Sequence, residues 1–356
     1  MAVNEGGAFP PPHQVAPRER DRVARFLRDT FHPPEDAPFL RPPVLDWKYF
    51  APRPDTAWPE GRSFAYLEDD RLTAHCAVWP LMLEAAGESI PAMHLIDWAA
   101  SKSHPGAGLI LYRALSEKAR CAVVIGGAAQ ARRILTRMGF AQVGEWNVYR
   151  RVVRPWRTFR EEPAEPGQAA KHAARLVRDS LLTLHPGRRR RAAEWSAAPI
   201  ARFEADSPAL APPDAEKGGP RQRFLHTAGF LNYVLSCPAC PWRAYTLLRN
   251  GLPAGYAVLN SLNRQARVAD LWVHDRTEEA WTAAAALAAQ LAARDFDASQ
   301  VLMSAASPFL SNILRRLGFQ HYAVKPVYLF DSQHALKPDP TRWHLTWLDS
   351  DAFLLP

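Results

Sequence analysis

Residues 95–108 read Leu-Ile-Asp-Trp-Ala-Ala-Ser-Lys-Ser-His-Pro-Gly-Ala-Gly, and this stretch decides the fold. It passes from a short apolar run, typical of a buried strand, through a polar loop to Gly106 and Gly108, and residues 109–119 then have helical spacing. Backbone N–H groups at a helix N-terminus are unpaired, and glycines let that backbone approach an anion closely. The stretch therefore predicts a strand, an anion-binding loop and a helix, the alternative being a strand-to-helix turn without a ligand.

The chain also repeats itself, because three features of the first half recur in the same order in the second. The two later stretches are predicted to be a buried strand and a helix that ends at glycine. We therefore expect two copies of one fold, with insertions in the second. The matched stretches are ARFLRD (24–29) with ARLVRD (174–179), LIDW (95–98) with VADLW (268–272), and ILTRMGF (134–140) with ILRRLGF (313–319).

Each copy is predicted to be an α+β domain, with a mixed, mostly antiparallel sheet flanked by helices. We expect a first domain at 1–156, a second at 165–333 and a C-terminal tail at 334–356, and the alanine-rich stretch 278–294 is a helix by propensity. The expected strands are Ser63–Leu67, Thr73–Trp79, Ala92–Ala99, Ala122–Gly126 and Val143–Val152, then Arg243–Leu248, Ala254–Leu259, Arg267–Val273, Gln300–Met303 and Tyr322–Phe330.

Composition narrows the class of protein. The 356 residues suit two domains of about 150 residues. No stretch approaches the roughly 18–20 apolar residues of a membrane span, and the N-terminus lacks a secretory signal, so we expect a cytoplasmic protein without a membrane partner. The net charge of +8 is concentrated in the arginine run 188–191, which predicts a surface patch rather than a nucleic-acid groove. Cys237 and Cys240 lack a second ligand pair, so no metal site is expected.

The order of elements, with Gly-Phe after the last helix, resembles the GNAT superfamily of N-acetyltransferases. The tandem layout is similar to mycothiol synthase and the Fem-type aminoacyl transferases. In that superfamily the loop Q/R-x-x-G-x-G/A holds the pyrophosphate of acyl-coenzyme A (acyl-CoA), although Ser103 stands here at the Gln/Arg position. The resemblance implies acetyl-CoA or another acyl-CoA as co-substrate. The residues implied to bind it are Trp98, Ala99, Ala100, Ser103, His104, Gly106, Ala107 and Gly108.

The second copy departs from this pattern. After Trp272 and Val273 the residues 274–279 read His-Asp-Arg-Thr-Glu-Glu, without glycine and with a net negative charge. A diphosphate would be repelled there, whereas acidic residues suit the first turn of an unliganded helix. We therefore expect acyl-CoA in the first copy only, with the second copy covering the acceptor pocket or serving as a scaffold.

Acyl transfer from a thioester to an amine needs a neutral amine, a polarised carbonyl and a proton for the leaving thiolate. Asp97 is the first candidate for the base, because a carboxylate in an apolar strand is costly unless it is used or paired. Asp270 holds the matching place in the second copy, so Asp97 is alternatively a structural anchor. His94 and His104 are other candidates, and Glu145 is a further one.

The proton donor is left open. Members of the superfamily often carry a tyrosine four residues before the glycine of Gly-Phe, and this chain has Leu135 there. Either Tyr112, Tyr149 or water replaces that tyrosine, or the protein does not turn over. Aromatic residues near Trp47 either line an acceptor groove or pack in the core.

Three functions remain open. The first is an acyl-CoA dependent N-acyltransferase for a small-molecule amine, such as a sugar or amino-acid derivative. The second is a non-catalytic pseudo-acyltransferase that binds a ligand or a partner protein. The third is a Fem-like aminoacyl transferase that uses charged RNA. The sequence leaves the acceptor, the acyl chain and the oligomeric state undetermined.

Overall fold

The computed structural model describes residues 11–354 except 54, 57, 59–60, 86, 162–166, 184–192, 212–221, 335 and 337–338. The arginine run 188–191 therefore lies outside the described residues. The described strands form one continuous mixed sheet of 14 strands.

The first half follows the predicted order. Strands β2, β3 and β4 are antiparallel neighbours, and β5 runs parallel to β4 after the helix α3. Alternating apolar residues on these strands face helices on both sides of the sheet. The bounds are α1 Arg20–Phe31, α2 Pro42–Leu45, the π-helical turn η3 Asp46–Phe50, β2 Ser63–Glu68, β3 Arg71–Ala85, β4 Glu88–Ala100, α3 Pro105–Ser116, β5 Cys121–Ile125, α4 Ala129–Arg137 and β6 Ala141–Val152.

The second half repeats this layout and confirms the predicted strands and the helix at 278–294. Strands β9, β10 and β11 are antiparallel neighbours, and β12 runs parallel to β11 after the buried alanine-rich helix α8. The bounds are β7 Trp195–Ile200, β8 Gln222–Phe224, α7 Ala228–Leu235, β9 Trp242–Arg249, β10 Leu252–Leu262, β11 Gln265–Val273, α8 Glu278–Asp295, β12 Gln300–Ala305, α9 Pro308–Arg316 and β13 Gln320–Asp331.

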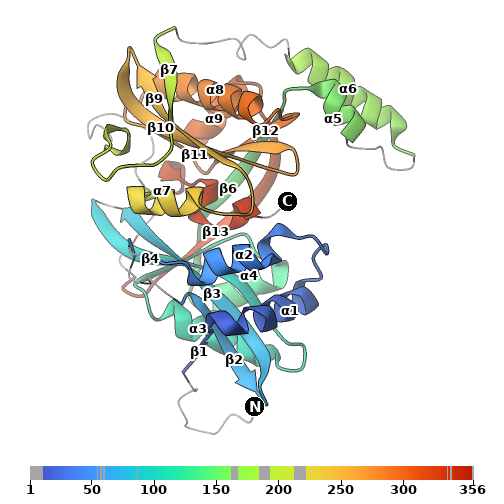
Figure 1. Ribbon diagram of the computed structural model, residues 1–356, viewed down its shortest axis with the longest axis vertical. Coiled ribbons are helices and arrows are strands. Elements are labelled where there is room, and N and C mark those ends of the chain that lie inside the picture. Colours follow the sequence, from blue (N-terminus) through green and yellow to red (C-terminus); the bar gives the residue numbers. More distant parts are fainter. Residues whose placement is uncertain are drawn as a thin grey trace.

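The halves join by exchanging their last strands. Across the junction the strand order is β4-β5-β13-β6-β12-β11, so β13 of the second half lies beside β5 of the first. Reciprocally, β6 of the first half lies beside β12, with Val152 opposite Gln300. Each half thus completes the sheet of the other, which explains the stacked arrangement of the two halves in Figure 1.

The helix α6 (Ala169–Thr183) carries the repeat of α1 but does not occupy the matching place. In α1, Val23 and Leu27 are buried, whereas in α6 Val177 is 60% exposed. The helices α5 (Pro155–Glu161) and α6 project together from the side of the molecule in Figure 1. The similar sequences therefore form similar helices that pack differently.

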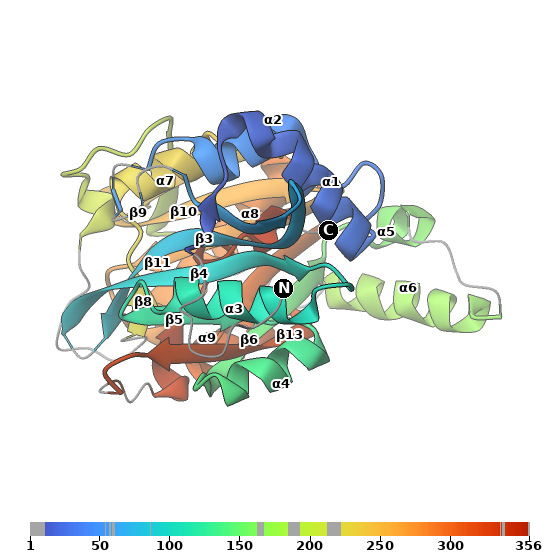
Figure 2. The ribbon, with the colours of Figure 1, turned by 90° about the horizontal axis from the view of Figure 1, so that it is seen from below.

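The last described segment, residues 343–354, lies between the halves, and we call it the tail segment. Trp79 donates from Nε1 to the carbonyl of Leu348 at 3.0 Å, and Arg267 donates to the carbonyl of Phe353 at 2.7 Å. Trp79 belongs to the first half and Arg267 to the second, so the segment connects both. Figure 2 shows α1, α2 and α7 together on one face of the sheet, with α3 and α4 on the other.

None of the helices in the described ranges combines the length and the apolar character that a bilayer crossing requires.

Candidate functional site

Strands β4 and β5 stop pairing partway along their length, and we call the place where they separate the first opening. The parallel pairing ends at His94 and Val123, although β4 continues to Ala100 and β5 to Ile125. A bulge in β4 shifts its register against β3 at this point, and Asp97 there has a φ of 50°. Bulges turn a strand away from its neighbour. The sequence-predicted residues after Asp97 therefore line the diverging edge.

The glycine loop follows directly on the end of β4 and leads into α3. Gly106 is exposed, and a Cβ added there would meet no atom within 4 Å. Gly108 is crowded instead, because an added Cβ would lie 2.8 Å from the Ala100 Cβ, and its carbonyl accepts a 2.8 Å hydrogen bond from Trp98 Nε1. The structure thus brings Trp98, Ala100 and Gly108 together and leaves Gly106 facing open space.

The start of α3 has no side-chain cap. His104 is the N-cap residue, but its imidazole bonds Ser103 Oγ at 2.9 Å and pairs with the Glu68 carboxylate instead of capping the helix. The amide of Ala107 is used, since it donates to the carbonyl of His104 at 3.0 Å. An uncapped helix start beside the open side of Gly106 fits the anionic diphosphate of an acyl-CoA.

Asp97 is the hub of a buried cluster. Its Oδ2 atom accepts a hydrogen bond from Tyr49 at 2.6 Å and pairs with Lys48 Nζ at 2.6 Å. Lys48 also reaches Asp351 of the tail segment at 3.3 Å, and the Asp97 carbonyl lies 3.0 Å from His75 Nδ1. The turn η3 supplies both Lys48 and Tyr49, so it holds the bulge of β4 from the face opposite α3.

Charge pairing decides the protonation of this cluster. Burial alone would raise the pKa of Asp97, but the Lys48 ammonium and the hydrogen bond from Tyr49 outweigh it and hold the pKa below its usual value. Burial would likewise lower the pKa of Lys48, and the two carboxylates raise it instead. For Asp351, which is farther from Lys48, burial prevails and raises the pKa. Asp97 is thus an ionised carboxylate whose Oδ2 atom has two partners, which favours the anchor role, and its role as a base stays a prediction.

The other candidate bases lie in different surroundings. His94 is buried in β4, which lowers its pKa to about 4, and its Nε2 faces the amide of Ile125 at 3.4 Å. A neutral imidazole occupied in this way bridges the diverging strands. Glu145 is exposed on β6, opposite Pro326 of β13, and within the described residues it forms no hydrogen bond or ion pair with the Asp97 cluster.

Of the two candidate proton donors, only Tyr112 adjoins the loop. Its ring lies 4.5 Å from that of Trp98, and its buried hydroxyl has no hydrogen-bond partner among the described residues. Burial raises its pKa well above the ordinary value, so the hydroxyl stays protonated. Leu135 is buried in the same apolar cluster. Tyr149 lies on β6, where it packs against His321 of β13 and pairs with Met303 of β12, in the region where the halves exchange strands.

The second half carries a counterpart of the Asp97 cluster. Asp270 accepts a hydrogen bond from Tyr256 at 2.8 Å and lies 2.7 Å from His226 Nδ1, whose Nε2 is 2.9 Å from Asp349 of the tail segment. Burial would lower the pKa of His226, but the two carboxylates raise it to about 9. Both imidazole nitrogens are therefore occupied, so His226 joins two acids and has no free nitrogen to accept a proton.

The second opening is closed by the chain itself. The β11–β12 pairing ends at Arg267 and Leu302, and beyond it Ser304 on β12 donates to the carbonyl of Leu345 at 3.4 Å. His344 packs against Trp272 of β11, with ring centroids 5.6 Å apart. The tail segment thus bridges the two strands where they separate.

The helix beyond that opening starts with a side-chain cap and an acidic first turn. Thr277 caps α8 by accepting from the amide of Ala280, and Glu278 and Glu279 stand in its first turn. The absence of a diphosphate site in the second copy stays a prediction.

Aromatic residues near Trp47 pack in the core. Trp47 is buried and stacks on Tyr233 of α7 at 4.5 Å, so the core interpretation is the one that the structure supports. The cysteines Cys237 and Cys240 are free.

Sequence reasoning missed the partners of both aspartates. Lys48 and His226 lie far from them along the chain, and neither belongs to a motif. The available signal was indirect. Asp97 and Asp270 recur at matched positions, and the tail carries Asp349 and Asp351 among aromatic residues.

Comparisons with known proteins agree with this architecture. No protein-family model and no curated protein matches the sequence. Among solved structures, the chain is similar to N-myristoyltransferase of Saccharomyces cerevisiae with bound myristoyl-CoA, at 11% identity and a TM-score of 0.59 over 96% of this chain and 86% of that one. It is also similar to a putative acetyltransferase from Pyrococcus horikoshii, at 9% identity and a TM-score of 0.55 over 98% and 99%.

A GCN5-related N-acetyltransferase from Anabaena variabilis matches at 10% identity and a TM-score of 0.55, over 89% of this chain and 71% of that one. At such identities the likeness concerns the fold. The predicted fold is confirmed: the chain has two tandem copies of the GNAT fold.

Proposed function

We propose, taking the tandem GNAT fold as the premise, that the chain is an acyl-CoA dependent N-acyltransferase. The first half would hold the acyl-CoA, with acetyl-CoA as the expected donor. The acceptor would be the amine of a small molecule, such as a sugar or an amino-acid derivative.

The observation that carries this proposal is a difference between the halves at the same place in the fold. In the first half the helix after the central strand starts without a side-chain cap, and Gly106 faces open space. In the second half Thr277 caps the helix, Glu278 and Glu279 add negative charge, and the tail segment bridges the strands. The two halves thus differ at the start of this helix, and the difference supports a diphosphate site in the first half only.

The chemistry divides among residues of the first half. An acyl-CoA would supply an activated thioester. The helix dipole of α3 and the amide of Gly106 would attract its diphosphate, and the backbone after the bulge at Asp97 would polarise the thioester carbonyl. Tyr112 is our choice for the proton donor, because its hydroxyl is protonated, unpaired among the described residues and beside Trp98.

Acetyl-CoA binding tests this proposal. Calorimetry of the native protein should give micromolar binding, and Gly106→Glu should weaken it by roughly tenfold or more because a carboxylate would face the diphosphate. Gly106→Ala is the matched control, since its Cβ would meet no atom within 4 Å and binding should be retained. Absence of acetyl-CoA binding by the native protein would reject the proposal.

A second candidate is the non-catalytic pseudo-acyltransferase. Two observations favour it: Leu135 stands buried where the family uses tyrosine, and Asp97 is occupied by Lys48 and Tyr49. The two candidates differ in turnover. Release of free thiol from acetyl-CoA in the presence of a panel of amines supports the enzyme, whereas binding without thiol release for any amine supports the pseudo-acyltransferase.

The Fem-like aminoacyl transferase remains a third proposal. Its motivation is the net charge of +8, and the arginine run that contributes to it lies outside the described residues. Such an enzyme must bind RNA through phosphate contacts, so retention of RNA at moderate salt would support it and loss of all binding would reject it.

A further inference from the structure

A cavity lies near the C-terminal end of α3, away from both openings. It has a volume of about 470 Å³, within the roughly 300–1,000 Å³ of small-molecule sites. Pro91 and Ala92 at the start of β4 line it, together with Lys118 just after α3. Because α3 spans 12 residues at about 1.5 Å each, this cavity lies roughly 18 Å from Gly106.

The inner wall of the cavity carries a donor without an acceptor. Arg53 is 1% exposed, and its Nε and Nη2 atoms both bond Asp55 at 3.0 Å. Its Nη1 atom is buried and has no hydrogen-bond partner among the described residues. An unsatisfied buried donor costs about 1–3 kcal/mol, so a ligand oxygen that reaches Nη1 from the cavity would offset this cost.

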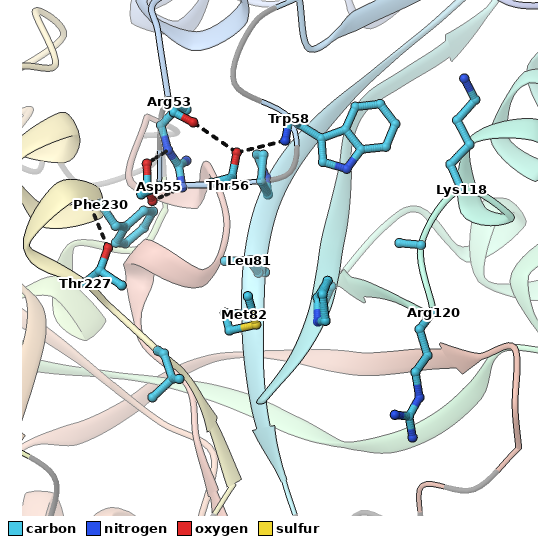
Figure 3. A pocket seen from close by; sticks show the side chains of 15 residues that line it. Arg53, Asp55, Thr56, Trp58, Leu81, Met82, Lys118, Arg120, Thr227 and Phe230 are labelled. Atoms are coloured by element: carbon cyan, nitrogen blue, oxygen red, sulfur yellow. Dashed lines mark hydrogen bonds and ion pairs between the residues drawn. The ribbon is translucent and has the colours of Figure 1, made fainter. Parts of the chain in front are cut away.

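The opposite wall carries positive charge. Figure 3 shows Arg53, Asp55 and Phe230 on one side of the cavity and Lys118 and Arg120 on the other. Arg120 is paired with two carboxylates, Glu88 at 3.3 Å and Asp331 at 3.7 Å, so the unpaired charge of this wall is that of Lys118. Lys118 is exposed, has no ion pair among the described residues, and lies with its Nζ 5.9 Å from the centre of the Trp58 ring. This wall therefore favours an anionic group beside an aromatic surface.

The space between the two walls is apolar. Leu81 and Met82 of β3 form its floor, the partly buried Trp58 offers a ring surface on one side, and Phe230, which is 3% exposed, closes the other. Flat apolar groups pack well against such rings.

We propose that this cavity is a binding site for a small organic anion. The ligand class is a flat apolar body with a carboxylate or phosphate at the Lys118 end and an oxygen acceptor at the Arg53 end. The site is separate from the acyl-CoA site by the length of α3. It stands on its own lining residues and does not depend on the proposed acyltransferase activity.

The probe is 6-hydroxy-2-naphthoate, which places a hydroxyl and a carboxylate at opposite ends of a flat body. Calorimetry on the full chain should detect binding, and the neutral methyl ester should bind about tenfold more weakly. Lys118→Glu should weaken the naphthoate by a similar factor. Arg113→Glu is the matched control, because Arg113 lies on α3, which ends just before Lys118, with a side chain that is 74% exposed and does not line the cavity.

Three outcomes overturn the proposal. Absence of naphthoate binding by the native protein would show that the cavity does not accept a flat organic anion. Equal binding of the methyl ester removes the anion preference, and unchanged binding by Lys118→Glu places the probe elsewhere. Gly106→Glu should leave naphthoate binding unchanged, so failure at this cavity is distinguishable from failure at the acyl-CoA site.

Discussion

At the scale of single residues, the pairing of Lys48 with Asp97 is the most constrained feature of the first half. Both side chains are buried, so removing one partner strands a charge in the core. Losing one member of a buried pair typically costs about 3–5 kcal/mol, whereas removing both together costs less. The pair therefore anchors the bulge of β4 whether or not Asp97 also takes part in chemistry.

We predict that Asp97→Asn and Lys48→Met each lower the free energy of unfolding by about 3–5 kcal/mol. Asparagine tolerates the positive φ of 50° at position 97, so the backbone should not add strain. The double variant should lose less than the sum of the two losses, as urea denaturation of all four proteins will reveal. Strictly additive losses would contradict the coupling.

The buried, protonated imidazole of His226 should make the stability of the protein depend on pH. The pKa of His226 is about 9 in the folded protein against 6.5 as the ordinary value. A raised pKa means that its stabilisation is complete below pH 6.5 and is lost as the pH rises through about 9. A shift of this size is on the order of 3 kcal/mol.

Chemical denaturation at a series of pH values measures this effect. The free energy of unfolding of the native protein should fall between pH 6.5 and 9, and His226→Gln should abolish most of that fall. A native protein whose stability is flat across this window would show that Asp270 and Asp349 do not hold the charged imidazole.

At the scale of elements, the tail segment is buried between the two halves. Trp347 packs edge-on against Trp146 of β6 with centroids 4.8 Å apart, and the Arg267 guanidinium lies 4.8 Å from its ring. The same segment supplies Asp349 to one aspartate cluster and Asp351 to the other. It is therefore a shared core element of both halves.

We predict that Trp347→Ala lowers the free energy of unfolding by about 3–5 kcal/mol, because it empties a packed site between the halves. Trp156→Ala is the control, since Trp156 on α5 is 56% exposed and its loss should change stability by less than about 0.5 kcal/mol. Similar losses from the two substitutions would argue against a core role for the tail segment.

At the scale of the whole molecule, strand exchange makes the halves interdependent. Without the second half, β6 loses β12 and β13, and β5 loses its pairing with β13. Unpaired apolar edges of this length favour aggregation. The boundaries at 156 and 165 thus remain a proposal. They would separate two copies of a fold, and we do not expect either copy to fold independently.

Expressing residues 1–156 and 165–356 separately tests this interdependence. Neither fragment should show cooperative thermal unfolding by circular dichroism, whereas co-expressed fragments should associate and the intact chain should unfold in one transition. Cooperative unfolding of the 1–156 fragment alone would contradict the expectation.

Local features were determined by the sequence itself. The ends of α4 and α9 at Gly139 and Gly318, the strands around Asp97 and Asp270, and the alanine-rich helix all follow from side-chain periodicity and helix caps, which act over a few residues. The contrast between the glycine loop at Gly106 and the acidic start of α8 could be predicted for the same reason.

Only the tertiary structure decided which distant segments meet. The repeat that buries α1 leaves α6 projecting, β13 enters the sheet of the other half, and the tail segment reaches both aspartate clusters through Lys48 and His226. Such choices depend on burying apolar surface and pairing buried charges across the whole chain. A local sequence pattern does not specify which distant residue a side chain will contact.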